Sequence, residues 1–192
     1  MNRTEFLSLG GFPLLLALTA MTQHDIEPET FLFKDDGKIP NSKYPLLLYR
    51  KAFQATGSAG ALGLEEHFAA NNWTNSWRNG VFTYHHYHST THEVLGVYSG
   101  SALLQLGGEK GEKVRVQAGD IVVIPAGVGH KKLESSADFG VVGAYPDGRN
   151  YDTLRGEPGE RPQADKNIAA VPLPATDPFL GKRGGLGDFW KE

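Results

Sequence analysis

The sequence predicts an all-β protein, an antiparallel sandwich or barrel, and three observations carry this prediction. Seven short segments between residues 80 and 144 are rich in β-branched and aromatic residues. Turn-forming clusters such as GGEKGE, AGD and PAGVG separate these segments at the short spacing typical of antiparallel sheets. The 192-residue chain also contains 24 glycines and 11 prolines, a turn-rich composition that favours short strands over long helices.

The first twenty residues precede the predicted sheet and allow three interpretations. Their apolar part resembles the core of a signal peptide, but Glu5 offsets the basic Arg3 and no suitable cleavage pattern follows. Translation could instead start at Met21, or the segment could dock on the domain. The expected location is the cytoplasm, or outside it if residues 1–20 are a true signal peptide.

The domain organisation follows from the change in composition along the chain. We expect residues 1–22 to be an extension and residues 23–192 to form one domain, since this length can bury a single core. Residues 80–145 would form the barrel core. Residues 146–192 are rich in Pro, Gly and Asp, and we expect them to wrap the barrel as a coil-rich tail.

Before the barrel core, the pattern predicts two strands and one short helix. Residues 30–50 read as strand, turn and strand, because DDGKIPN interrupts two apolar runs. Residues 57–63 read as a loop. Leu64 and Phe68 lie four residues apart, with two glutamates between them in the first turn, which indicates a short amphipathic helix.

The strands of the core can be placed individually, and so can the apolar anchors of the tail. The predicted strands are residues 80–88, 93–98, 102–106, 113–117, 121–124, 130–133 and 140–144. In the tail, residues 168–173 and 189–190 are apolar enough to attach the segment to the barrel.

Charge and composition exclude several functions. A formal net charge of -3 argues against nucleic-acid binding, which needs a basic face. The absence of cysteine excludes disulfides and thiolate chemistry. The apolar run at residues 6–20 is too short to span a bilayer. The chain has no nucleophile elbow, phosphate loop or dinucleotide fingerprint.

Four histidines and a glutamate crowd into residues 80–100, in a chain with seven histidines. His86 and His88 are two residues apart in a strand-like run, so both side chains should point to one face. Glu93 begins the next strand, and His130 follows a Pro-Ala-Gly turn. Three imidazoles and a carboxylate suit one divalent ion of Mn, Fe, Co, Ni or Zn, with positions left open for water or substrate.

Two motifs contain these four residues, GVFTYHHYHSTTHEVLGVYSG at 80–100 and GDIVVIPAGVGH at 119–130. Their order and spacing resemble the two motifs of the cupin superfamily. The amino-acid sequence of the first motif, together with the tail segment YDTLRGEP, is similar to that of the small bacterial cupins called YjlB-like. This resemblance implies an antiparallel jelly-roll barrel and a divalent metal held by His86, His88, Glu93 and His130. Glu134 departs from the family, which usually has asparagine there.

Two further residues are candidates for catalysis. Tyr84 shares the predicted inward face of His86, and its phenol could donate to a substrate, although it could also be a core residue. His92 adjoins Glu93 and could contact a substrate, or serve only as a turn residue. His85 should face the opposite side from His86.

These observations favour a metal-dependent enzyme acting on a small molecule, of the dioxygenase, isomerase or decarboxylase type. The alternative is a module that binds a metal or a small ligand without catalysis. A third interpretation is a barrel without a metal, in which the four polar residues are vestigial. The presence of all four candidate ligands argues against this interpretation. The expected partners are a small-molecule substrate and a second copy of the chain, because cupins often dimerise through barrel edges.

Overall fold

The computed structural model describes residues 26–182 and 184–191, so the predictions made for residues 1–22 lie outside the described residues. The elements are, in chain order, β1 (Glu29–Phe31), β2 (Leu46–Tyr49), α1 (Gly57–Ala70), β3 (Trp73–Asn79), β4 (Glu93–Ser99), β5 (Ser101–Leu106), β6 (Glu112–Gln117), β7 (Ile121–Ile124), β8 (His130–Ser135), β9 (Gly140–Pro146), α2 (Gln163–Ala170) and α3 (Leu186–Phe189).

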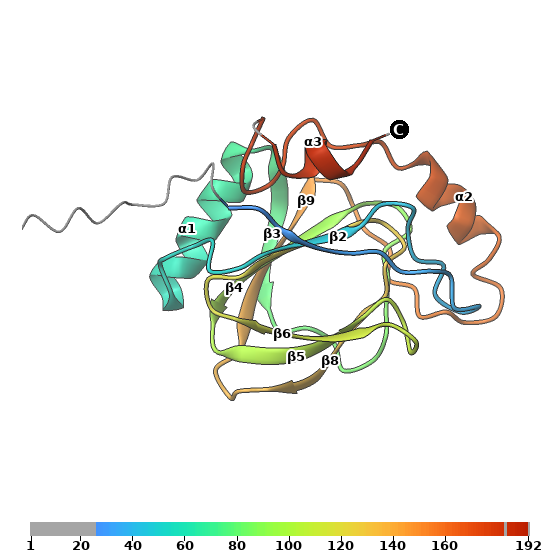
Figure 1. Ribbon diagram of the computed structural model, residues 1–192, viewed down its shortest axis with the longest axis horizontal. Coiled ribbons are helices and arrows are strands. Elements are labelled where there is room, and N and C mark those ends of the chain that lie inside the picture. The colour runs from blue at the N-terminus through green and yellow to red at the C-terminus, as the bar shows by residue number, and fades with distance from the viewer. Residues whose placement is uncertain (1–25, 183, 192) are drawn as a thin grey trace, which may run out of the picture.

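The strands form two sheets that face each other. One sheet has the order β1-β2-β7-β4-β9-β3 and the other the order β6-β5-β8, and every pairing is antiparallel. Figure 1 shows the smaller sheet below the larger one, with α1 and α3 outside the larger sheet. This arrangement confirms the predicted all-β fold of the jelly-roll type.

The larger sheet is covered on both faces, which explains its continuous apolar strands. In β2, Leu46 and Leu48 pack in the core between the sheets. Leu47 and Tyr49 pack in a second core, under α1 and the end of the chain. Because neighbouring side chains on a strand point to opposite faces, a strand between two cores must be apolar at every position.

Helix α1 begins at Gly57, so the predicted loop at residues 57–63 is wrong. Glycine disfavours helices, yet two glycines in this stretch allow close packing. A Cβ atom at Gly60 would lie 2.5 Å from the carbonyl oxygen of Ala55, and one at Gly63 would lie 2.9 Å from the Phe53 ring. Tertiary packing therefore overrides the local preference.

The segment 80–88 is not the regular strand that was predicted. Strand β3 ends at Asn79, and the segment after it makes only isolated bridges. His86 and His130 exchange backbone hydrogen bonds, with N–O distances of 3.2 and 2.9 Å. Tyr87 exchanges them with Leu154 of the tail. The segment is irregular because its backbone pairs alternately with the barrel and with the tail.

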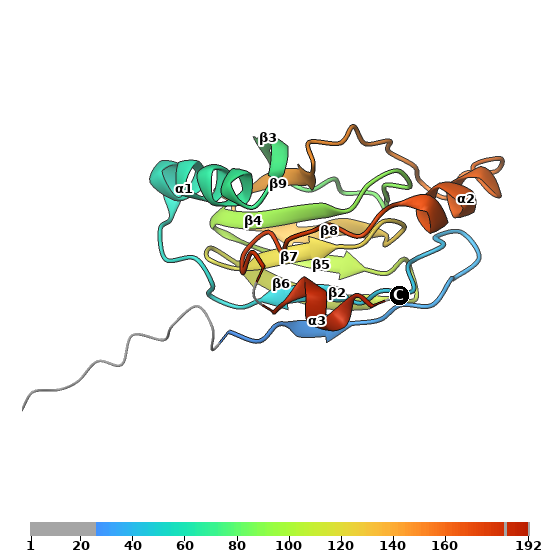
Figure 2. The same ribbon diagram turned by 90° about the horizontal axis from the view of Figure 1, so that it is seen from above.

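The described part of the tail runs along the outside of the sheets and contains the two short helices α2 and α3 (Figure 2). Of its predicted anchors, Trp190 is buried in the second core, whereas Phe189 is 39% exposed. The Trp190 indole N–H donates to the Pro45 carbonyl at 2.7 Å. Among the described residues, no helix has the length and hydrophobicity to cross a membrane.

Candidate metal centre

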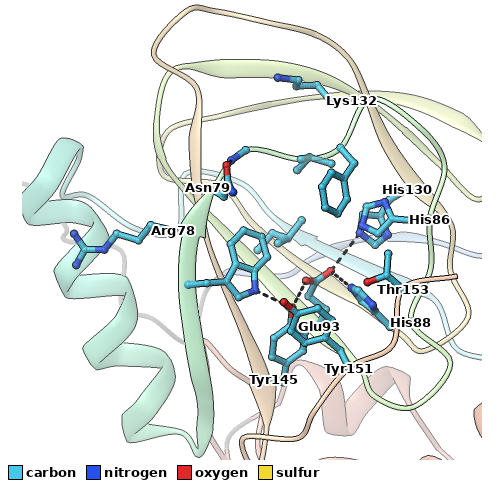
Figure 3. A pocket seen from close by; sticks show the side chains of 15 residues that line it. Arg78, Asn79, His86, His88, Glu93, His130, Lys132, Tyr145, Tyr151 and Thr153 are labelled. Atoms are coloured by element: carbon cyan, nitrogen blue, oxygen red, sulfur yellow. Dashed lines mark hydrogen bonds and ion pairs between the residues drawn. The ribbon is translucent and has the colours of Figure 1, made fainter. Parts of the chain in front are cut away.

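Three histidines converge at one end of the space between the sheets. The side chains of His86, His88 and His130 are buried, and each offers a ring nitrogen within 4.8 Å of the other two. The ring centroids of His86 and His130 are 4.0 Å apart. Figure 3 shows the three rings beside Glu93, so the structure brings together all four predicted ligands.

Each ligand has a different structural support. His130 is the first residue of β8, and its backbone bridge with His86 holds these two rings together. Glu93 is the first residue of β4, where it pairs with Ile124 of β7. His88 lies in the irregular segment, and the tail fixes its ring because Nδ1 contacts the carbonyl oxygen of Asp152.

Glu93 is almost fully buried and lies between two of the histidines. Its Oε2 atom is 3.3 Å from Nε2 of His88 and 3.3 Å from Nε2 of His130. Burial alone would raise the pKa of the Glu93 carboxyl, but these two imidazoles outweigh it and hold the pKa below its usual value. The carboxyl is therefore ionised.

The histidines respond differently to the same surroundings. Burial, together with the neighbouring His130, lowers the pKa of His86 to about 2. Burial also acts to lower the pKa of His88, but the Glu93 carboxylate outweighs it and raises that pKa. His86 is therefore a neutral imidazole, the form in which histidine binds metals.

The hydrogen bonds of the rings show that the site suits a cation. Nδ1 of His88 donates to the Asp152 carbonyl, and Nδ1 of His130 donates to the Val128 carbonyl at 3.2 Å, since carbonyl oxygens only accept. In the neutral rings, both Nε2 atoms then point lone pairs toward Glu93. Lone pairs and a carboxylate repel one another unless positive charge, from a proton or a metal ion, lies between them.

Two buried atoms strengthen this interpretation. Oε2 of Glu93 and Nδ1 of His86 have no hydrogen-bond partner, and a buried polar atom without one is costly. Imidazole nitrogens and a carboxylate oxygen are donors that divalent transition metals accept. The residues present therefore fit such an ion.

A pocket of about 440 Å³ opens beside the four ligands. Its walls combine apolar and aromatic side chains with a few polar groups, as small-molecule sites do. The residues that line it are Trp77, Arg78, Asn79, Gly80, Val81, Phe82, His86, His88, Glu93, Leu95, His130, Lys132, Tyr145, Tyr151 and Thr153.

Tyr84 and His92, the two predicted catalytic residues, lie outside the pocket lining. Tyr84 stacks on Phe82 with ring centroids 4.9 Å apart, and the Arg155 guanidinium lies 4.0 Å from its ring centre. The Tyr84 and His86 ring centroids are 6.1 Å apart. Tyr84 therefore lies next to a candidate ligand but does not line the pocket.

The structure does not bring His92 to the metal ligands. Its Nδ1 accepts the backbone N–H of Ala126 at 2.9 Å, and its ring lies 4.7 Å from that of Trp190. It lines a separate pocket beside α2. Burial lowers the pKa of His92 to about 3, so the ring is neutral. In this position His92 connects the two motifs structurally.

The sequence analysis missed several residues of the site. Tyr145 donates its hydroxyl to Oε1 of Glu93 at 3.0 Å, and Trp77 donates to Tyr145 at 2.8 Å. Tyr151 and Thr153 reach the pocket from the tail. Only Tyr145 had a signal in the sequence, since it lies one residue past the predicted strand 140–144, and counting in twos from Val141 places it on the same face as that residue.

The fold and the four candidate ligands indicate one class of protein, and the comparison with known sequences establishes that class. A family model described as "Cupin domain" matches residues 78–133, which contain all four ligands. The chain belongs to the cupin superfamily. It is 51% identical over 165 residues to "Uncharacterized protein YjlB" of Bacillus subtilis (strain 168), a match that covers 85% of this chain and 97% of that protein. This identity confirms the resemblance predicted from the motifs.

Solved structures are similar in parts of the fold. A DUF861 family protein from Thermotoga maritima matches with a TM-score of 0.29 and 24% identity, over 42% of this chain and 83% of that one. Procruciferin, an 11S globulin from Brassica napus, matches with a TM-score of 0.33 and 23% identity, over 41% of this chain and 20% of procruciferin. A variant of Bacillus subtilis oxalate decarboxylase matches with a TM-score of 0.35 and 18% identity, over 61% of this chain and 29% of that protein. The chain thus spans less than a third of the latter two, and these likenesses carry nothing about function.

Proposed function

We propose that this protein is a metal-dependent enzyme that acts on a small molecule, with one divalent transition metal held by His86, His88, Glu93 and His130. The observation that carries the proposal is the buried Glu93 carboxylate, which faces two imidazole nitrogens at 3.3 Å without a hydrogen bond to Oε2. Such an ion, when bound, supplies a Lewis acid or a site for oxygen chemistry. Reactions of the dioxygenase, isomerase or decarboxylase type are the candidates.

The residues around the ligands would bind the substrate and keep water out. Phe82, Leu95 and Tyr151 provide apolar wall. Lys132 also lines the pocket, and its ammonium has no carboxylate partner within the described part of the chain. In contrast, the nearby Arg78 is paired with Glu65 at 2.6 Å. The free charge of Lys132 would attract the anionic end of a substrate.

Metal analysis of protein purified without a histidine tag tests the proposal. We expect about one equivalent of a transition metal in the native protein and its loss in His88→Ala. His85→Ala is the matched control, because His85 belongs to the same segment but does not line the pocket. Less than about a tenth of an equivalent in the native protein, unchanged in His88→Ala, would remove the metal from the proposal.

Turnover separates an enzyme from a binding module. The metal-loaded protein should be screened against diols, keto-sugars and 1,3-diketones, with oxygen uptake and product formation followed. Turnover that disappears in His130→Ala supports catalysis. Tight retention of a ligand without turnover, whichever metal is loaded, would favour the non-catalytic module.

We also infer a cytoplasmic homodimer. Strand β6 pairs only with β5, so within the described residues its outer edge is open to a second copy. Sedimentation should give twice the mass of the chain, and a monomeric mass would contradict the dimer. Mass spectrometry of the native N-terminus would test the location, because removal of residues 1–20 would indicate export.

A further inference from the structure

Three strands that are neighbours in the larger sheet contribute one residue each to a buried chain of hydrogen bonds. The Trp77 indole N–H of β3 donates to the Tyr145 hydroxyl of β9 at 2.8 Å. The Tyr145 hydroxyl donates to Oε1 of Glu93, on β4, at 3.0 Å. Figure 3 shows Tyr145 beside the Glu93 carboxylate, which faces the histidines.

The chemistry of these groups sets the direction of the chain. An indole N–H can only donate, and an ionised carboxylate can only accept. Trp77 therefore occupies a lone pair of the Tyr145 oxygen, and the Tyr145 hydrogen must point to Glu93. The arrangement has one consistent set of hydrogen positions.

The packing holds the chain in place. Trp77 lies opposite Gly143 in the sheet, and a Cβ atom at Gly143 would lie 2.2 Å from the indole ring. Only glycine at this position lets Trp77 reach Tyr145. The Tyr145 side chain is buried, and the ring of Tyr151 stacks on it with centroids 4.5 Å apart.

As a consequence, the two carboxylate oxygens of Glu93 have different surroundings. Oε1 accepts the Tyr145 hydroxyl, whereas Oε2 has no hydrogen bond and lies 3.3 Å from Nε2 of both His88 and His130. A carboxylate can turn about its terminal bond and bind a cation with one oxygen or two. The hydroxyl bond prevents this rotation.

We propose that Trp77 and Tyr145 are positioning residues that hold Glu93 as a ligand through Oε2 alone. This inference rests on the proposed metal site and assigns to these residues the control of its coordination. Use of a single oxygen of Glu93 leaves one more coordination position free for substrate or water.

Binding of Co²⁺ tests the inference without any knowledge of the substrate. Tyr145→Phe should keep the ring and remove the hydroxyl, so Glu93 can turn. We expect affinity for Co²⁺, measured by competition with a chromophoric chelator, to fall about tenfold. The visible absorption spectrum of bound Co²⁺ should also change, because it follows coordination number and geometry.

Tyr49→Phe is the matched control. It also removes a buried tyrosine hydroxyl that donates to a carboxylate, that of Asp177 at 2.6 Å, but on the opposite face of the larger sheet from the core between the sheets. We expect Tyr49→Phe to lower thermal stability while leaving the Co²⁺ affinity and spectrum unchanged. A loss of affinity equal to that of Tyr145→Phe would show a general effect of stability and overturn the inference.

A double-mutant cycle with Glu93→Gln separates positioning from direct binding. If Tyr145 acts only through Glu93, adding Tyr145→Phe to Glu93→Gln should reduce Co²⁺ affinity no further. Independent losses would overturn the inference. Trp77→Phe removes the donor to Tyr145 together with part of the ring, and it should shift the Co²⁺ spectrum in the same direction by less, which gives a second variant if Tyr145→Phe folds poorly.

The outcomes distinguish the two proposals. If native protein binds no Co²⁺, the proposed metal site fails, and this inference fails with it. If native protein and Tyr145→Phe bind Co²⁺ with the same affinity and spectrum, the metal site stands and the positioning role is wrong.

Discussion

At the scale of single residues, three of the four candidate ligands are oriented by a hydrogen bond made outside the ligand set, whereas Nδ1 of His86 has no such partner. His88 donates to the carbonyl of Asp152, His130 donates to that of Val128, and Glu93 accepts from Tyr145. Partners of this kind determine which ring nitrogen carries the proton and which atom faces the ion. Asp152 has a second role, because its carboxylate accepts from the backbone N–H of Ser89 at 2.6 Å and also from the Ser89 hydroxyl.

Asp152→Ala should therefore loosen the His88 segment. We expect the backbone amide of Ser89 to exchange hydrogen faster, and metal affinity to fall about tenfold. Hydrogen exchange followed by mass spectrometry, together with chelator competition, measures both. Asp138→Ala is the control, since this exposed carboxylate accepts from Ser99 outside the pocket lining. Unchanged exchange at Ser89 would contradict the role given to Asp152.

At the scale of secondary structure, β4 connects the candidate site to the second core, the one under α1. Its first residue, Glu93, is a candidate ligand, and its middle residue, Gly96, lies under α1. A Cβ atom at Gly96 would lie 2.9 Å from both Leu64 and Phe68, the residues with which α1 packs on the sheet. The missing side chain allows the helix to approach the strand closely.

Gly96→Ala should accordingly destabilise the protein by overpacking, with a loss of about 1–3 kcal/mol in the free energy of unfolding. Urea denaturation measures the loss. Gly187→Ala is the matched control, because a Cβ atom there meets nothing within 4 Å. Equal stability of the two variants would show that α1 can move away from β4 without cost.

At the scale of the whole molecule, the tail completes both the core and the site. Trp190 closes the second core, while Tyr151 and Thr153 line the pocket. Asp177 fastens the last part of the tail. Its buried carboxylate accepts the Tyr49 hydroxyl and the backbone N–H groups of three tail residues, Phe179, Leu180 and Leu186. A carboxylate with four donors is fully satisfied although it is buried.

Asp177→Asn should detach this end of the chain. The side-chain NH₂ group of the new asparagine would face donors that now bind a carboxylate oxygen. At least one buried donor would therefore lose its acceptor, which costs about 1–3 kcal/mol in the free energy of unfolding. We expect limited proteolysis to cut the variant after residue 177 faster than the native protein, as mass spectrometry would show. Tyr49→Phe, which removes a single bond, should have a smaller effect. Equal resistance of Asp177→Asn and native protein would contradict the role of Asp177.

The strands from Glu93 onward could be predicted from the sequence because their signals, alternation along a strand and glycines in the turns, act within a few residues. The four candidate ligands were predicted from the spacing within two motifs, and the fold brings the two motifs together. The predicted strands 93–98 and 121–124 accordingly match β4 and β7 closely.

Only the tertiary structure decided how the ligands are supported. The Trp77–Tyr145–Glu93 chain depends on the sheet order β4-β9-β3, and the His88–Asp152 contact depends on where the tail returns. The sequence places His92 beside a ligand, yet its ring binds Ala126 instead. These features arise from contacts between residues far apart in the chain, which no local pattern records. The sequence by itself predicted four candidate ligands, and the packing of the sheets and the tail determined how these side chains are oriented.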